Sequence, residues 1–192
     1  MILFVNACVR RDSRTGRLAK RLLQGREEEI LEVRPAELKL PRVNERFLRK
    51  RDTLLAEGAF SDPLFDLARD FAAAEEIVVA APYWDLSFPS ALKAYLEQIT
   101  VNGVTFSYGE DGQPISHCHA KRLVYVMTAG GPILPPNHGF AYVRDLCGTF
   151  FGIREAKLFS AEMLDVYGVD VEAVLRRTEK QIDRWKKKTC GA

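Results

Sequence analysis

The segment Ile77-Val78-Val79-Ala80-Ala81-Pro82-Tyr83-Trp84-Asp85-Leu86-Ser87-Phe88-Pro89-Ser90 contains a short apolar run followed by a proline and two aromatic residues. The residues after it, Ala91-Leu92-Lys93-Ala94-Tyr95-Leu96, are typical of a helix. A buried strand that leads through such a loop into a helix places flat side chains at the carboxyl edge of a sheet. In open α/β sheets, planar cofactors bind at that edge. The segment therefore predicts an α/β sheet with a ligand site at one edge.

The rest of the chain alternates short apolar runs with longer helical patterns. The runs are rich in Val, Ile, Leu and Phe, as in strands covered on both faces, and they lie at 2–6, 29–33, 76–81, 123–128 and 156–160. The helical patterns lie at 15–24, 62–74, 90–99, 139–151 and 170–188. This alternation predicts a parallel sheet with right-handed crossovers and helices on both faces. Five strands fit a flavodoxin-like, doubly wound five-stranded sheet, but one sequence does not reveal the strand order.

The size and composition of the chain are those of one soluble globular domain. Its 192 residues are 47% hydrophobic and 28% charged, which is enough for one substantial core. We expect a single domain over residues 1–192, with an irregular surface excursion near 35–60 and a small hairpin near 103–116. The formal net charge of +2 gives no electrostatic reason to expect binding to nucleic acid or to a membrane surface.

The cysteines and the apolar stretches favour a cytoplasmic protein. No stretch approaches the roughly 20 apolar residues that span a bilayer, and residues 1–5 are too few for a secretory signal. Free thiols in a reducing compartment are expected, because no CxxC pair occurs among Cys8, Cys118, Cys147 and Cys190. His117 and His119 flank Cys118, but zinc needs three or four ligands and nothing nearby completes the set. No metal site is therefore expected.

The loop after the first strand, residues 7–18, combines hydroxyl groups with positive charge at a predicted helix N-terminus. Backbone N–H groups and the helix dipole attract anions there, and Ser13 and Thr15 add hydroxyl donors. Four arginines add charge: Arg10, Arg11, Arg14 and Arg17. A phosphate monoester, with about two negative charges, suits this corner. Alternatively, Ser13 only caps the helix and the arginines are solvated. Cys8 is either a thiolate favoured by these arginines or a plain buried thiol.

Two further loops are predicted to leave the same edge of the sheet. Tyr83 and Trp84 would either lie against an aromatic heterocycle or pack in the core or in a subunit interface. In Thr128-Ala129-Gly130-Gly131-Pro132, two glycines allow the backbone to approach a ligand closely, although an ordinary tight turn explains them equally well. Three such loops, on the first, third and fourth strands, together predict one composite site.

These loops resemble those of the flavodoxin-like NAD(P)H-dependent oxidoreductases, the family of FMN-dependent NADH azoreductases and NAD(P)H:quinone reductases. The likeness covers nearly the whole chain and is strongest at 81–93, 103–106 and 128–131, while Ser13-Arg14-Thr15 is similar to the family's Ser-x-Ser phosphate loop. The resemblance implies three groups of FMN contacts: Ser13, Arg14 and Thr15 for the phosphate; Pro82, Tyr83, Trp84, Asp85 and Leu86 for the isoalloxazine; and Thr128, Ala129, Gly130 and Gly131 for its pyrimidine edge.

The resemblance also implies an activity and an assembly. NADH or NADPH would reduce the flavin, and a small aromatic acceptor such as a quinone, an azo dye or a nitro compound would then take the electrons in a ping-pong scheme. The chain would be a homodimer with the flavin at the subunit interface. His138 resembles a histidine of the quinone reductases and is either a proton donor to the reduced flavin or a surface residue that caps a helix.

Two other functions fit the same fold. A flavodoxin-like electron-transfer protein would pass single electrons to partner proteins, but such carriers tend to be shorter and strongly acidic. A flavin-free binding or regulatory module is suggested by two departures from the azoreductase pattern. Asp85 stands where those enzymes usually carry Asn, and Ala7-Cys8 begins a loop that usually has a serine. An ionised carboxylate beside a flavin carbonyl is repulsive unless it turns away or binds a proton.

Overall fold

A computed structural model describes residues 1–189, so Cys190 lies outside the described residues. Its main sheet has five strands in the order β2-β1-β3-β6-β7, and every neighbouring pair is parallel. The strands are β1 (Ile2–Asn6), β2 (Ile30–Val33), β3 (Glu76–Ala80), β6 (Arg122–Thr128) and β7 (Glu155–Ala161). An antiparallel hairpin is formed by β4 (Phe106–Tyr108) and β5 (Pro114–Ser116). The predicted flavodoxin-like, five-stranded parallel sheet is confirmed.

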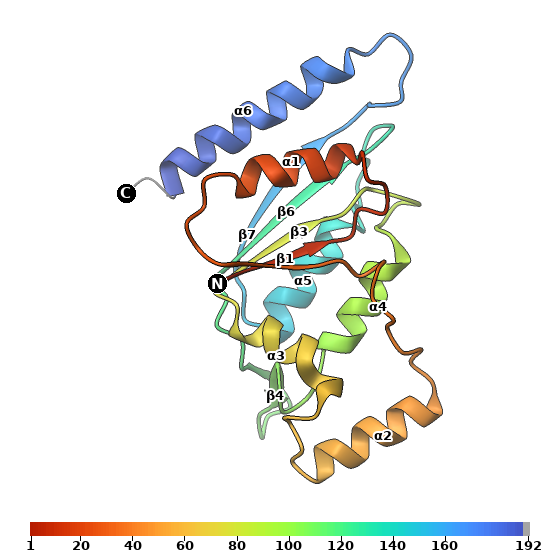
Figure 1. Cartoon of the computed structure of the whole chain (residues 1–192), viewed down its shortest axis with the longest axis vertical. Helices are drawn as coiled ribbons and strands as arrows, with labels where there is room; N and C mark the ends of the chain where they lie inside the picture. Colours follow the sequence, from red (N-terminus) through yellow and green to blue (C-terminus); the bar gives the residue numbers. More distant parts are fainter. Residues whose placement is uncertain (190–192) are drawn as a thin grey trace.

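Helices cover both faces of this sheet. They are α1 (Arg14–Leu23), α2 (Glu45–Ala56), the 3₁₀ turn η1 (Pro63–Phe65), α3 (Asp66–Ala73), α4 (Ser90–Ile99), α5 (Phe140–Phe150) and α6 (Val171–Thr189). Figure 1 shows α1 and α6 along one face and α3, α4 and α5 on the other. In β1, Ile2 and Phe4 belong to the core under α1 and α6, whereas Leu3 and Val5 belong to the opposite core. Because successive side chains of a strand point to opposite faces of the sheet, each strand contributes residues to both cores.

The excursion near 35–60 differs from the irregular path expected for it, because it contains helix α2. Asn44 caps this helix, its side chain accepting a hydrogen bond from Phe47 N at 3.0 Å, and an ion pair joins Glu45 to Arg49 one turn later. None of its residues is buried, and Figure 1 places α2 at the lower end of the molecule, away from the sheet. Capping and the ion pair thus support a helix that is only partly buried, through Leu54 and Leu55 against the cluster of Phe65, Ala68 and Val101.

The parallel sheet brings the loops that follow its strands to one edge, because the carboxyl ends of parallel strands point the same way. Backbone pairing continues past the strand ends: Tyr83 N donates to Thr128 O at 2.9 Å, and Ala129 N donates to Ala161 O at 2.9 Å. The loops after β1, β3, β6 and β7 therefore start from one rigid platform. Among residues 1–189, none of the helices combines the length and apolar character that a membrane span requires.

Candidate active site

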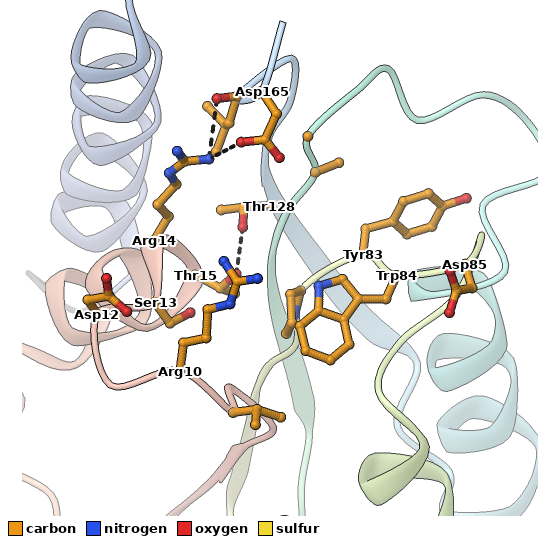
Figure 2. Close-up of a pocket in the computed structure, with 15 residues that line it drawn as sticks. Arg10, Asp12, Ser13, Arg14, Thr15, Tyr83, Trp84, Asp85, Thr128 and Asp165 are labelled. Atoms are coloured by element: carbon orange, nitrogen blue, oxygen red, sulfur yellow. Dashed lines mark hydrogen bonds and ion pairs between the residues drawn. The ribbon is translucent and has the colours of Figure 1, made fainter.

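A hollow of about 560 Å³ opens at the carboxyl edge of the sheet (Figure 2). The loops after β1, β3 and β6 line it, together with the loop after β7. Ten of the twelve residues predicted to bind the cofactor lie in its wall: Ser13, Arg14, Thr15, Pro82, Tyr83, Trp84, Asp85, Thr128, Ala129 and Gly130. Leu86 and Gly131 are not part of the wall. The structure therefore brings the three predicted loops together around one space.

The N-terminus of α1 faces this hollow. The side chain of Ser13 accepts a hydrogen bond from Gly16 N at 3.2 Å and so caps the helix, as one of the two readings of the sequence had it. Its hydroxyl proton remains able to donate to a ligand, so capping and anion binding are compatible. The positive end of the α1 dipole adds to the charge of Arg10 and Arg14, whose side chains also line the hollow.

A hydroxyl pair at the base of the hollow joins two of the loops. Thr15 Oγ1 and Thr128 Oγ1 lie 2.6 Å apart, and both residues are buried. This bond connects the start of α1 to the end of β6 (Figure 2). The bond fixes the relative position of the two loops, and the predicted contact of Thr15 with a phosphate stays a prediction.

Leu164 and Asp165, in the loop after β7, form a fourth side of the hollow that was not predicted from the sequence. Arg14 donates to Asp165 Oδ1 at 2.7 Å and to the Leu164 carbonyl at 3.3 Å. The loop is held by backbone bonds, since Asp165 N donates to Gly130 O at 2.9 Å and Leu164 N donates to Ala129 O at 3.1 Å. One signal was available: this loop leaves the same sheet edge after the fifth predicted strand. The rule that singled out the other three loops applies to it as well.

Gly130 makes the contact with this fourth wall possible. A Cβ atom on Gly130 would lie 3.1 Å from Asp165 Cγ and 3.2 Å from Asp165 Cβ. Gly131 has no neighbouring atom within 4 Å of the same position. The first glycine of the pair is therefore required by close packing inside the protein, and the second is not.

The two aromatic residues after β3 separate in space. Figure 2 shows the Trp84 indole turned into the hollow, toward the side where Arg10 lies, and the Tyr83 ring turned the other way. Tyr83 packs near Gly139, where an added Cβ would lie 3.3 Å from its ring. Trp84 packs less closely and is 40% exposed to solvent. Of the two rings, Trp84 alone offers its face to a ligand.

A tight reversal follows Trp84. Trp84 N donates to Ser87 O at 3.1 Å and Ser87 N donates back to Trp84 O at 2.7 Å. Asp85 and Leu86 between them have φ values of 50° and 64°, in the left-handed region. Asp tolerates this region, whereas a leucine there is strained. Strain of this kind persists only where the surroundings enforce it, and it tends to occur at functional sites.

The remaining candidates lie outside the hollow. His138 is exposed and absent from its wall. The N-terminus of α5 is instead capped by Asn137, whose Oδ1 accepts from Gly139 N and Phe140 N at 3.1 Å each. The catalytic role of His138 stays a prediction. Cys8 is buried and burial raises the pKa of its thiol, which favours the plain buried thiol. Among residues 1–189, no group of His, Cys, Asp and Glu side chains has the geometry of a metal site.

Comparisons with known proteins agree with this fold and site. The Flavodoxin_2 family, described as having a flavodoxin-like fold, matches residues 1–188. An FMN-dependent NADH:quinone oxidoreductase of Coprothermobacter proteolyticus is 32% identical over 183 residues, 90% of each chain. FMN-dependent NADH:quinone oxidoreductase 2 of Clostridium acetobutylicum is 43% identical over 116 residues, which are 58% of this chain and 57% of that protein.

A solved structure extends the comparison to three dimensions. An FMN-dependent NADH-azoreductase from Bacillus anthracis, solved in complex with FMN, superimposes with a TM-score of 0.81 and 19% identity, covering 97% of both chains. At that identity the structural match concerns the fold. The family match over residues 1–188 and the 32% identity to the Coprothermobacter protein over 90% of the chain carry the assignment further: the chain belongs to the flavodoxin-like family that includes the FMN-dependent NADH:quinone oxidoreductases.

Proposed function

We propose that the protein is an FMN-dependent oxidoreductase that uses NADH or NADPH to reduce quinones and azo or nitro aromatics. The observation that carries the proposal is the hollow itself, where a helix N-terminus, an exposed indole face and a glycine-containing loop meet. The names of the relatives, FMN-dependent NADH:quinone oxidoreductases, support the same cofactor and donor.

The residues of the hollow fit FMN part by part. Ser13, Arg10 and the start of α1 provide donors and positive charge for a phosphate. Trp84 provides a flat face for the isoalloxazine. The backbone of Ala129 and Gly130 borders the same space. A volume of about 560 Å³ is within the range of small-molecule and cofactor sites.

FMN, when bound, supplies the redox chemistry, accepting a hydride from the dinucleotide and passing electrons to the acceptor. The protein has three tasks. Trp84 orients the ring system by stacking, and the anion site at α1 holds the cofactor by its tail. The Trp84–Ser87 reversal directs the Asp85 carboxylate away from Arg10, so that the two side chains lie on opposite sides of Trp84 (Figure 2). Because the cofactor is the reactive group, the site needs no side-chain nucleophile.

The acceptor, the assembly and the compartment are part of the proposal. The acceptor is a small aromatic molecule that stacks where the dinucleotide leaves. The assembly is a homodimer, supported by apolar side chains exposed on the loops that follow β1, β3 and β6, with Val9, Leu86 and Leu134 at 53%, 65% and 67% exposure. The compartment is the cytoplasm, supported by the free thiols of Cys8, Cys118 and Cys147. Sedimentation equilibrium tests the assembly, and a monomer at micromolar concentration contradicts it.

The decisive experiment combines a spectrum with a turnover assay. After addition of FMN and removal of the excess, we expect flavin bands near about 370 and 450 nm. NADH should then reduce menadione catalytically without any added reductase. A protein that takes up no FMN is a flavin-free module. A protein that binds FMN but turns over only with a separate reductase is an electron carrier.

Replacing the indole tests the stacking role. Trp84→Ala should weaken FMN binding by about tenfold or more, because stacking of a heterocycle on an aromatic side chain contributes about 1–3 kcal/mol. Trp84→Phe keeps a flat ring and should retain most of the affinity. Fluorescence titration of the apoprotein with FMN measures both. Equal affinity for FMN in wild type and Trp84→Ala contradicts this placement of the flavin.

A further inference from the structure

We infer that Asp165, in the loop after β7, is a positioning residue: it holds the side chain of Arg14 beside the hollow, where Arg14 can bind the phosphate of FMN. The inference rests on the proposed function, in which the hollow binds FMN with its phosphate near the start of α1. It deepens that function, because it gives a fourth loop a part in a cofactor site that was predicted to have three.

Arg14 connects the start of α1 to the loop after β7. Its Nη1 atom donates to Asp165 Oδ1 at 2.7 Å and to the Leu164 carbonyl oxygen at 3.3 Å. Figure 2 shows the Arg14 side chain reaching across to this loop. One nitrogen of the guanidinium therefore has two acceptors on the same loop, and together they restrict the position of a long side chain.

The loop that carries Asp165 is itself fixed to the edge of the sheet. Its backbone N–H groups at residues 163–165 donate to the carbonyl oxygens of residues 129–131 at 2.9–3.2 Å. The Asp165 side chain also lies close to Gly130, where an added Cβ atom would be 3.2 Å from Asp165 Cβ. The backbone thus sets the place of the carboxylate, and Arg14 is the partner whose position is selected.

Arg14 keeps donor groups for a ligand. Its Nε and Nη2 atoms form no hydrogen bond with any residue from 1 to 189. Arg14 lines the hollow together with Ser13, and its side chain is 42% exposed. A guanidinium group that the protein holds through one nitrogen can offer the other two to phosphate oxygens. The arrangement therefore suits a cation that is bound to the protein on one side and open to an anion on the other.

The ion pair orders Arg14 more than it stabilises the fold. The Asp165 side chain is 70% exposed, and exposed ion pairs contribute little to folding. An arginine that is already ordered loses less rotamer freedom when a ligand binds, which is worth about two- to tenfold in affinity. The charge of Asp165 repels a phosphate only weakly, because solvent screens it and Arg14 neutralises it at 2.7 Å.

The test compares two ligands that differ only in the phosphate. FMN and riboflavin share the isoalloxazine and the ribityl chain, so the Arg14–Asp165 pair should affect the binding of FMN alone. The test variant is Asp165→Ala, and Asp165→Asn keeps an acceptor oxygen for Arg14. The control variant, Glu155→Ala, removes a carboxylate that pairs with Arg122 at the same 2.7 Å but lies at the other end of β7. Fluorescence titration of each apoprotein measures both affinities.

We expect Asp165→Ala to weaken FMN binding by about two- to tenfold, and Asp165→Asn to weaken it less. Riboflavin affinity should equal that of wild type in every variant, and Glu155→Ala should bind FMN like wild type. In an Arg14→Ala background, Asp165→Ala should have no further effect on FMN binding, a coupling that a general loss of structure would not produce.

Three results overturn the inference: unchanged or tighter FMN binding in Asp165→Ala, an equal loss of FMN and riboflavin affinity, or additive effects of Arg14→Ala and Asp165→Ala. The wild-type titration separates these results from a failure of the proposed function. If wild type binds neither flavin, the proposed function and the inference fail together. If wild type binds FMN and reduces menadione with NADH, but Asp165→Ala binds FMN as tightly, only the inference fails.

Discussion

Gly130 and Gly131 are adjacent glycines, but only Gly130 lacks space for a Cβ atom. Gly130 faces Asp165 so closely that a methyl group there would displace the carboxylate, whereas Gly131 has open space around it. The sequence Gly-Gly predicted a close approach of backbone to a ligand. The structure shows that the first glycine also serves a contact inside the protein, with a residue 35 positions later.

Substituting each glycine separates the two requirements. Gly130→Ala should destabilise the protein by about 1–3 kcal/mol, because overpacking shifts the Asp165 loop and its ion pair with Arg14. Gly131→Ala should be neutral or stabilising by about 0.4–1 kcal/mol, since alanine lowers the entropy of the unfolded chain. Urea unfolding of both variants measures the difference. Equal unfolding midpoints contradict the close contact.

At the residue scale, the sequence predicted the residue types of the site better than their partners. Ser13, Thr15 and Trp84 were all recognised, and all three line the hollow. The bond between Thr15 and Thr128 spans 113 positions, and that between Arg14 and Asp165 spans 151. Such pairings depend on strand order, which local patterns do not contain. The pairing also shows that Thr15 joins two loops, and its predicted role as a phosphate ligand stays a prediction.

Helices α1 and α2 differ in how much of their surface is buried, although a side chain caps the N-terminus of each. Helix α1 buries Leu18 and Leu22 in the core, whereas α2 buries none of its residues. Both begin with a side-chain cap, Ser13 in α1 and Asn44 in α2. The same local interaction therefore serves a helix that is buried in a main core and one that is only partly buried, through Leu54 and Leu55, against a small separate cluster.

Removing each cap should have different consequences. Ser13→Ala should lower the global free energy of unfolding by about 1 kcal/mol, because the capping bond belongs to the core helix. Asn44→Ala should leave the urea midpoint nearly unchanged and speed hydrogen exchange of the α2 amides by about fivefold, through local opening. Hydrogen exchange resolved by residue measures the second effect. An equal loss of global stability in both variants contradicts a separate opening of α2.

At the element scale, burial explains which predictions were accurate. The five strands and helices α1, α4, α5 and α6 were placed within about two residues of their observed ends, because burial on a sheet gives a strong hydrophobic pattern. The helix expected from residue 62 begins at Asp66, after the 3₁₀ turn η1. Helix α2 has only a partly buried apolar stripe (Phe47, Leu48, Leu54 and Leu55), and the charged residues around it made its segment resemble a loop. Its signals were the Asn44 cap and the Glu45–Arg49 pair, which are weak in isolation.

The whole molecule carries ionisable groups whose pKa values differ between the folded and unfolded states. Arg26 beside Glu28 lowers the pKa of that carboxyl to about 2 from 4.5, and Arg21 lowers the pKa of Asp183. Burial raises the pKa of the Cys118 and Cys147 thiols to about 12 from 9.0. Folding thus favours the ionised forms of Glu28 and Asp183 and the neutral forms of the two thiols, whereas burial raises the pKa of Asp70.

These shifts predict that the free energy of unfolding is highest at intermediate pH and falls at both acid and alkaline pH. Below about pH 4.5, Glu28 binds a proton in the unfolded chain but stays ionised in the folded protein. The free energy of unfolding therefore falls as the pH is lowered toward 2. Above about pH 9 the unfolded thiols ionise while the folded ones cannot, so stability falls again toward pH 12. Urea midpoints across this range measure the profile. Glu28→Gln should flatten the acid limb alone, and an unchanged acid limb contradicts the role of Glu28.

At the scale of the whole fold, alternation of strands and helices was sufficient to predict the architecture, since connections in parallel sheets are right-handed. The order β2-β1-β3-β6-β7 came only from the structure. That order places the end of β7 beside the end of β6, which brings Asp165 to the site. The missed fourth wall is therefore a consequence of topology rather than of any one residue.

The hydroxyl bond between Thr15 and Thr128 is made entirely within the polypeptide. Together with the backbone bonds between the loops after β6 and β7, it gives the socket its form before any prosthetic group arrives. A bound cofactor should then add stability by mass action, in proportion to the logarithm of its concentration over its dissociation constant, without a further folding step.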